Sequence, residues 1–170
     1  MELFSANGYR GTSMAAVGRA AGIAAAAVHW YFPTKDDLFA AALSSIFGEA
    51  RERVEADPEI GGNPRDELVG LLVAVEPYRM LHREAYERMA ESESVRIAYE
   101  RIQQWMEQRL FASLASRLPV GSDVGLIADA GHVLFEGILV SMRRLDRPIG
   151  DLFDLVADAL VAIAATRVAR

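Results

Sequence analysis

Almost every stretch of this 170-residue sequence between its glycine and proline breaks has the spacing of a helix. Alternation of polar and apolar residues and runs of β-branched residues, the usual signals of strands, are absent. The pair Asn7-Gly8 suits the end of a helix, because these residues adopt the left-handed backbone conformation that stops it. We therefore predict an all-α fold, with helices over 1–6, 12–21, 24–31, 34–55, 64–75, 77–89, 94–118, 123–145 and 150–168.

Residues with known end preferences mark the first helix boundaries. Thr12 is expected to cap the helix that Gly22 closes, and Thr34 to cap the long helix that follows. In the short alanine-rich helix between them, Val28 lies four residues before Phe32. Both side chains should therefore face inward.

The composition excludes several classes of protein. A hydrophobic content of 52% is too high for a disordered chain, and no uncharged apolar run is long enough to cross a bilayer. No signal peptide is visible, and the absence of cysteine excludes disulfides and thiolate metal sites. We expect a soluble, cytoplasmic protein with no membrane contact, no metal and no cofactor.

The charge is unevenly distributed along the chain. A net charge of −6 argues against a protein that coats nucleic acid without regard to sequence. Residues 1–47 are nevertheless neutral, because three basic side chains balance three acidic ones. These are Arg10, Arg19 and Lys35 against Glu2, Asp36 and Asp37. The two regions are therefore expected to have different tasks.

The first 43 residues combine two short helices across a glycine turn, which is the arrangement of a helix-turn-helix. In order and spacing, the stretches ELFSANGYRGTSM, VGRAAGI and VHWYFPTKDDLF resemble the DNA-binding domain of the tetracycline-repressor (TetR) family of bacterial regulators. The resemblance implies a three-helix DNA-binding domain over 1–47 and a helical effector-binding and dimerisation domain over 48–170. It further implies a ligand-responsive repressor that binds a two-fold double-stranded DNA operator as a homodimer and is released by a small apolar effector.

The resemblance also places the DNA contacts. Thr12 is similar to a residue that caps the second helix and touches a phosphate, and 24–31 looks like the recognition helix of the major groove. The DNA-contacting residues implied in this way are Thr12, Ala24, Ala25, Ala27, His29, Trp30, Tyr31 and Lys35.

The polar members of this set have different expected roles. His29 and Trp30 fall where base or backbone contacts are usual, and Tyr31 and Lys35 fall on phosphate-contacting positions. Lys35 is the only lysine in the chain, and a cation at a helix start gains when a phosphate lies nearby. The alternatives are an ordinary solvated lysine and aromatic side chains that pack in the small core.

Two features depart from the family. Ala24 stands where Ser or Thr is usual, which costs about 1 kcal/mol of capping and removes hydrogen bonds to DNA. The alanines still permit close approach to the groove and contact with thymine methyl groups. The first helix is also short, which should leave the three-helix core open on one side, and we expect Met1 to lie inside a longer native chain.

The last two helices carry apolar residues round most of their circumference, so each needs more than one neighbour. We expect a homodimer through these helices, and the alternative is a monomer in which both are central.

Large apolar side chains with a few polar groups in the second half suit an apolar ligand pocket. The candidates are Tyr86, Met89, Trp105, His132 and Phe135, with plain core packing as the alternative for each. His132 has three readings: a ligand contact, a satisfied core histidine or an interface residue.

Enzymatic readings are disfavoured. A phosphate-binding glycine loop, a G-x-S-x-G elbow and an H-E-x-x-H pair are all absent. We therefore predict that the chain is not an enzyme. The alternative to the regulator is a helical small-molecule-binding dimer that has lost or weakened operator binding.

Overall fold

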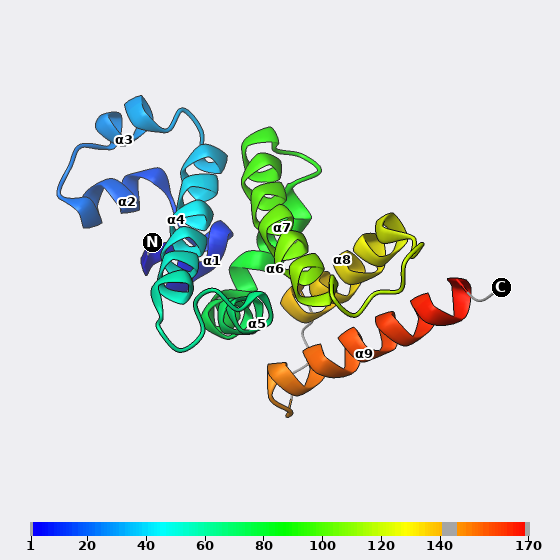
Figure 1. Ribbon diagram of the computed structural model, residues 1–170. Helices are drawn as coiled ribbons and strands as arrows, with labels where there is room; N and C mark the ends of the chain where they lie inside the picture. The colour runs from blue at the N-terminus through cyan, green and yellow to red at the C-terminus, as the bar shows by residue number, and fades with distance from the viewer. Residues whose placement is uncertain (1, 141–145, 169–170) are drawn as a thin grey trace. The chain divides into compact units, whose positions relative to one another are not determined.

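The computed structural model describes residues 2–140 and 146–168, without the side chain of Phe135. Within these ranges every regular element is a helix, which confirms the all-α prediction (Figure 1). The elements are α1 Glu2–Gly11, α2 Met14–Ala21, α3 Ala25–Tyr31, α4 Lys35–Ala56, α5 Pro64–Val75, the 3₁₀ turn η1 Glu76–Tyr78, α6 Arg79–Arg88, α7 Glu93–Leu114, α8 Val124–Val140 and α9 Ile149–Val168. The expected helix over 123–145 continues past the described residues, so its end is outside them.

The helix ends follow the expected chemistry with two corrections. Thr34 caps α4, because its hydroxyl accepts the Asp37 N–H at 3.1 Å while Asp37 accepts the Thr34 N–H at 2.9 Å. Helix α2 is capped by the Ser13 side chain and not by Thr12. The predicted stop at Asn7-Gly8 is a break within α1, since Gly8 has φ 68° and helical turns resume after it.

The chain packs as two compact units. The first contains Met1–Glu49 and Pro77–Ile102, and the second contains Ala50–Glu76 and Gln103–Arg170. Helices α4 and α7 each continue from one unit into the other. These units divide the chain by packing, and the functional boundary at residue 47 stays a prediction.

Helices α1, α4, α6 and α7 build the core of the first unit. Phe4, Phe39, Leu43, Leu81 and Tyr99 are each no more than 3% exposed. An apolar pocket of about 480 Å³ lies between α1, α2 and α4.

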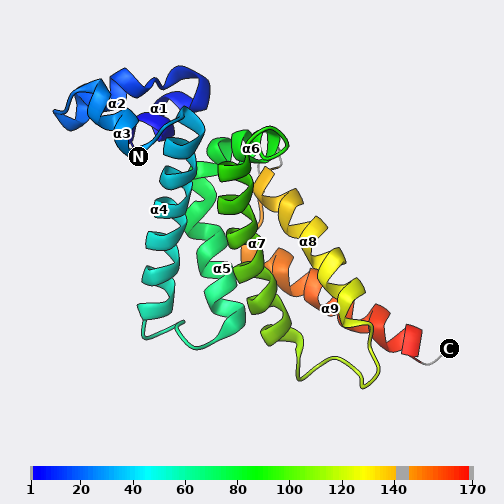
Figure 2. The same cartoon turned by 90° about the horizontal axis from the view of Figure 1, so that it is seen from above.

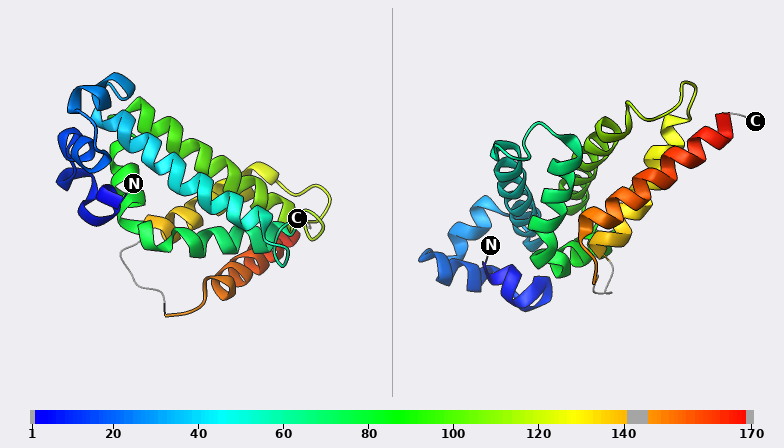
Figure 3. Two further views of the ribbon diagram at one scale, coloured as in Figure 1. Left: turned by 90° about the vertical axis from the view of Figure 1, so that its left-hand side faces the viewer. Right: turned by 60° about the horizontal axis from the view of Figure 1, so that its bottom comes forward.

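The second unit contains α5, α8, α9 and the ends of α4 and α7 (Figure 2). Its core includes Leu71, Leu110 and Phe153, which are no more than 3% exposed. Helices α8 and α9 lie side by side in it, as the two views of Figure 3 show. None of the helices in the described ranges is long and apolar enough to cross a membrane.

Candidate DNA-binding site

Helices α2 and α3 meet at a tight turn whose backbone conformation favours glycine. Gly22 has φ 69°, and the Ile23 N–H behind it donates to the Gly18 carbonyl oxygen at 2.9 Å. A Cβ on Gly18 would lie 3.0 Å from the Ile23 carbonyl oxygen. The two glycines therefore bring α2 and α3 close together, as a helix-turn-helix requires.

The faces of α3 are divided between core and solvent. Val28 is 3% exposed and anchors the helix, whereas Trp30 is 78% and Tyr31 is 68% exposed. The Trp30 and Tyr31 rings meet edge to face at 4.6 Å, and His29 is exposed beside them. All three polar aromatic side chains thus lie outside the core, which rules out the core-packing alternative for them.

The alanines at the start of α3 leave a thin, open helix surface. Ala24 occupies the N-cap position without a side-chain hydrogen bond, as its lack of a hydroxyl predicts. Ala24 and Ala25 are exposed, and Ala27 is half-buried. A helix end without a cap is less stable by about 1 kcal/mol, so α3 depends on Val28 and the Gly22 turn for its position.

Thr12 does not have its predicted place. It is 1% exposed, and its hydroxyl lies 2.8 Å from the Gly8 carbonyl oxygen and 3.0 Å from that of Leu3. The hydroxyl therefore closes the end of α1 from inside and is not available to a phosphate. The exposed neighbour Ser13 makes the predicted cap, accepting the Ala16 N–H at 3.1 Å. The sequence offers two adjacent hydroxyls, and only packing decides which is buried.

Lys35 begins α4, next to α3 in the chain, and its ammonium lies 4.1 Å from the centre of the Tyr9 ring. Partial burial and the nearby Arg88 guanidinium lower the pKa of Lys35. Both acidic neighbours in sequence are engaged elsewhere, Asp36 with Arg88 and Asp37 with Thr34. Among the described residues, no carboxylate pairs with Lys35, so its charge is available to an anion.

This lysine belongs to a cluster of five residues, which we call the Tyr9 cluster. It joins α1, α4 and α6 and consists of Tyr9, Lys35, Asp36, Glu84 and Arg88. The Tyr9 hydroxyl donates to Asp36 Oδ1 at 2.5 Å, and the Tyr9 N–H donates to Glu84 Oε2 at 2.7 Å. The Arg88 guanidinium donates two bonds of 2.8 Å to the Asp36 carboxylate and lies 4.2 Å from the Tyr9 ring centre.

The electrostatics of the cluster follow from these contacts. Burial and the hydrogen bond to Asp36 raise the pKa of Tyr9 to about 12. The Arg88 guanidinium holds the pKa of the Asp36 carboxyl below its usual 3.8. No local pattern in the sequence pointed to Arg88, because its partner Asp36 lies 52 positions away.

The predicted ligand-binding residues are not gathered in one unit. Tyr86 and Met89 belong to the first unit, where Met89 packs against the core and the Tyr86 ring meets that of Tyr99 at 6.2 Å. Trp105 and His132 belong to the second, and the side chain of Phe135 lies outside the described residues.

The two candidates in the second unit are hydrogen-bonded. Trp105 is 8% exposed and donates its indole N–H to Glu55 at 3.0 Å. The ring nitrogens of His132 lie 3.1 Å from a Glu107 oxygen and 3.2 Å from a Glu136 oxygen. These contacts favour the reading of His132 as a satisfied polar residue, and its role toward a ligand stays a prediction.

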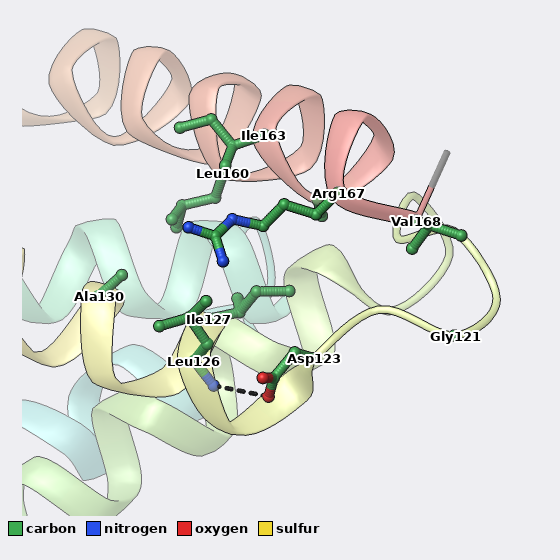
Figure 4. A pocket seen from close by; sticks show the side chains of 10 residues that line it. Gly121, Asp123, Leu126, Ile127, Ala130, Leu160, Ile163, Arg167 and Val168 are labelled. Atoms are coloured by element: carbon green, nitrogen blue, oxygen red, sulfur yellow. Dashed lines mark hydrogen bonds between the residues drawn. The ribbon is translucent and has the colours of Figure 1, made fainter. Parts of the chain in front are cut away.

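A pocket of about 340 Å³ lies between α8 and α9 (Figure 4). Its walls are mostly aliphatic side chains, and it is not lined by Tyr86, Met89, Trp105 or His132, the predicted ligand-binding residues whose side chains are described. The aliphatic side chains of the walls are those of Leu126, Ile127, Ala130, Leu160, Ile163, Ala164 and Val168. Arg167 extends from α9 into the gap, while Asp123 accepts the Leu126 N–H at 3.0 Å at the start of α8. Within 2–140 and 146–168, no group of three metal-ligating side chains is found.

Comparisons with known proteins agree with this geometry. Residues 1–42 match the family model described as bacterial regulatory proteins, tetR family. No curated protein is similar enough in sequence to count as a match.

Several solved structures share the fold over nearly the whole chain. One, assigned as a TetR-family transcriptional regulator from Mesorhizobium loti MAFF303099, is 21% identical with a TM-score of 0.63, covering 95% of this chain and 91% of that one. A transcriptional regulator from Rhodococcus sp. Rha1 is 19% identical with a TM-score of 0.60, covering 97% and 91%.

A TetR-like transcriptional regulator from Rhodococcus sp. RHA1 is 25% identical, with a TM-score of 0.52 over 95% of this chain and 90% of that one. The family match covers the region of the helix-turn-helix, and the structural matches extend through the helical remainder. The family model thus describes the DNA-binding region of such regulators, and the solved structures share the overall helical fold. Residues 1–42 thus match the model of the TetR family of bacterial regulatory proteins, and the chain as a whole is similar in fold to solved regulators of that type.

Proposed function

We propose that this protein is a ligand-responsive transcriptional repressor that binds a two-fold operator as a homodimer and is released by a small apolar effector. The observation that carries the proposal is the exposed surface of α3 beside an unpaired lysine. Trp30 and Tyr31 are largely exposed although they are large aromatic residues, and Lys35 has no carboxylate partner among the described residues. Such side chains suit a partner with stacked bases and phosphates.

The contacts divide into base reading and phosphate binding. His29 and Trp30 reach base edges in the major groove, while Tyr31 and Lys35 contact phosphates. The alanines let the backbone approach the groove closely and touch thymine methyl groups. Thr12 is left out of this set because its side chain is buried.

A second copy of the chain covers the outer apolar face of α8 and α9. The large apolar side chains that α8 and α9 expose are Val124, Leu126, Val133, Leu134, Leu155, Ile163 and Val168, each between 39% and 67% exposed. Burial of aliphatic surface contributes about 25 cal/mol per Å², so a self-complementary pair of such faces favours a two-fold dimer. The rim of the pocket between α8 and α9 belongs to the same face.

Residues 48–170 then serve as the effector-binding and dimerisation domain, and 1–47 as the DNA-binding domain. An apolar effector that fits one arrangement of the helical body better shifts the population toward it, which changes the spacing of the paired recognition helices. A regulator of this kind works in the cytoplasm, where its operator lies.

A second candidate is a helical small-molecule-binding dimer with lost or weakened operator binding. The uncapped start of α3 at Ala24 favours it, since the hydroxyl that would also bond to DNA is missing there. This candidate shares the dimer and the effector with the repressor and differs only in DNA affinity.

Fluorescence anisotropy with duplexes that tile the region upstream of the coding sequence separates the two candidates. The repressor binds one duplex more tightly than the rest; Tyr31→Ala weakens binding to all of them, and His29→Ala or Trp30→Ala changes their ranking. Arg83→Ala is the control, because it truncates an exposed side chain on α6 that is outside the proposed DNA contacts. If no duplex is preferred and none of the α3 variants differs from the control, the second candidate is the correct one.

A further inference from the structure

We propose that Tyr9 is a positioning residue for the DNA phosphate contact of Lys35, and that Arg88 of α6 holds Tyr9 in place together with Asp36. The proposal rests on the proposed function, because it assumes that Lys35 meets a phosphate. It assigns a role to two residues outside the helix-turn-helix contacts, one in α1 and one in α6.

The Tyr9 ring restricts the lysine side chain. A lysine has four rotatable bonds and reaches many positions when it is free in solvent. Here its ammonium lies 4.1 Å from the ring centre, a distance at which the π electrons attract the cation. An ammonium already confined near the start of α4 loses less freedom when a phosphate binds it, so affinity increases.

Tyr9 of α1 is held by side chains of two other helices, α4 and α6. Its hydroxyl donates to Asp36 of α4, and its backbone N–H donates to Glu84 of α6. Arg88 lies 4.2 Å from the ring centre and also binds Asp36 through two hydrogen bonds. A two-point guanidinium–carboxylate pair is directional, and with side-chain exposures of 26% and 20% it is partly shielded from solvent.

The distribution of charge in the cluster leaves a place for an anion. Asp36 is the nearest acid in sequence to Lys35, yet Arg88 and Tyr9 occupy its oxygens. The remaining cation, Lys35, has Arg88 as a like-charged neighbour and feels the opposite charges of Asp36 and Glu84, but no carboxylate of the described residues pairs with it directly. A phosphate at the ammonium would add an opposite charge to Lys35 and Arg88 without displacing a bond that the cluster already makes.

The alternative is that the cluster only joins α1, α4 and α6 and contributes nothing to DNA binding. Lys35 is the only lysine of the chain, which allows a direct measurement of its surroundings. Reductive ¹³C-methylation keeps the charge of the ammonium, and its NMR signal then reports whether an aromatic ring lies next to it. Because the Lys35 ammonium lies over the face of the Tyr9 ring, the ring current of Tyr9 should move this signal upfield.

The experiment compares Tyr9→Phe, Tyr9→Leu and Arg88→Gln with the unchanged full-length protein, by this NMR signal and by duplex affinity at several salt concentrations. Tyr9→Phe keeps the ring and should keep most of the upfield shift. Tyr9→Leu should bring the signal to the position of a free lysine and weaken binding about tenfold, as loss of one well-placed phosphate contact does. Arg88→Gln should give a smaller change in the same direction.

Tyr78→Leu is the control, because Tyr78 is partly buried against the same core and loses the same atoms. It should change neither the lysine signal nor the affinity. Combining Tyr9→Leu with Lys35→Ala should give no further loss beyond Lys35→Ala alone, since both remove one contact.

An unshifted lysine signal in the unchanged protein overturns the proposal, and so do additive losses in the double variant. The NMR comparison needs no DNA. If no duplex binds although the signal is shifted and depends on Tyr9, the proposed function fails and the placement of Lys35 stands.

Discussion

At the scale of single residues, the joint between α1 and α6 depends on one glycine. Gly8 has φ 68°, and a Cβ there would lie 2.8 Å from Glu84 Oε1, the carboxylate that accepts the Tyr9 N–H. The sequence predicted a helix break at Asn7-Gly8 from turn chemistry alone. It gave no indication of Glu84, because a contact across 75 positions leaves no local pattern.

We predict that Gly8→Ala lowers the free energy of unfolding by about 1–3 kcal/mol, the usual range for a side chain forced into a left-handed conformation against a neighbour. Gly48→Ala is the control, since nothing lies within 4 Å of its added Cβ and it is inside α4. That substitution should stabilise the protein by up to about 1 kcal/mol. Urea unfolding measures both, and equal effects of the two substitutions would show that Gly8 is not special.

At the scale of helices, α6 contains a histidine that the predicted function does not use. His82 is 2% exposed, and burial lowers its pKa from 6.5 to about 4. Its Nδ1 is buried and finds no hydrogen-bond partner among the described residues. The ring is therefore neutral in the folded protein.

The unfolded chain binds a proton at this histidine near pH 6.5, whereas the folded chain does so only near pH 4. The difference in proton binding therefore has no effect on the free energy of unfolding above pH 6.5. It lowers this free energy by about 3 kcal/mol as the pH drops from 6.5 to 4. His82→Leu should reduce the slope of unfolding free energy against pH between 6.5 and 4. His29→Gln, at an exposed site, should leave it unchanged; equal slopes for His82→Leu and the unchanged protein would contradict the assignment.

Most helices could be predicted, and their ends less reliably. Helix α5 has the predicted bounds, because Pro64 and the Asn63 cap fix its start. Helix α7 ends at Leu114, before the predicted 118. The backbone N–H groups of Arg117 and Leu118 both donate to the Leu114 carbonyl oxygen, so residues 115–118 form turns and do not continue the helix. The cap of α2 was assigned to Thr12 because propensity does not distinguish a buried hydroxyl from an exposed one.

The part of the candidate DNA site that is built from residues close together in sequence could be predicted. The turn at Gly22 and the exposed aromatic residues of α3 follow from spacing within about ten residues. The Tyr9 cluster depends on α6, and the chain reaches α6 only after some 50 further residues. The predicted effector residues were chosen by residue type, and residue type does not show into which unit a side chain packs.

At the scale of the whole molecule, the proposed dimer is formed by the apolar surface of α8 and α9. A charged side chain introduced there should therefore weaken dimerisation. Val133→Glu with Leu155→Glu, at positions 66% and 67% exposed, should convert the dimer to a monomer without unfolding it. Val73→Glu is the control, at a 55% exposed position of α5. Sedimentation at micromolar concentration measures the outcome, and an unchanged protein that already sediments as a single 18.6 kDa chain would contradict the dimer.

The central claim is that Lys35 meets a DNA phosphate in both copies of a dimer. The most direct measurement is the slope of log affinity against log salt concentration for the preferred upstream duplex, with and without Lys35→Ala. Each phosphate contact contributes about 0.9 to this slope, so the variant should reduce it by about 2 for the dimer. An identical slope for the variant and the unchanged protein would contradict the claim.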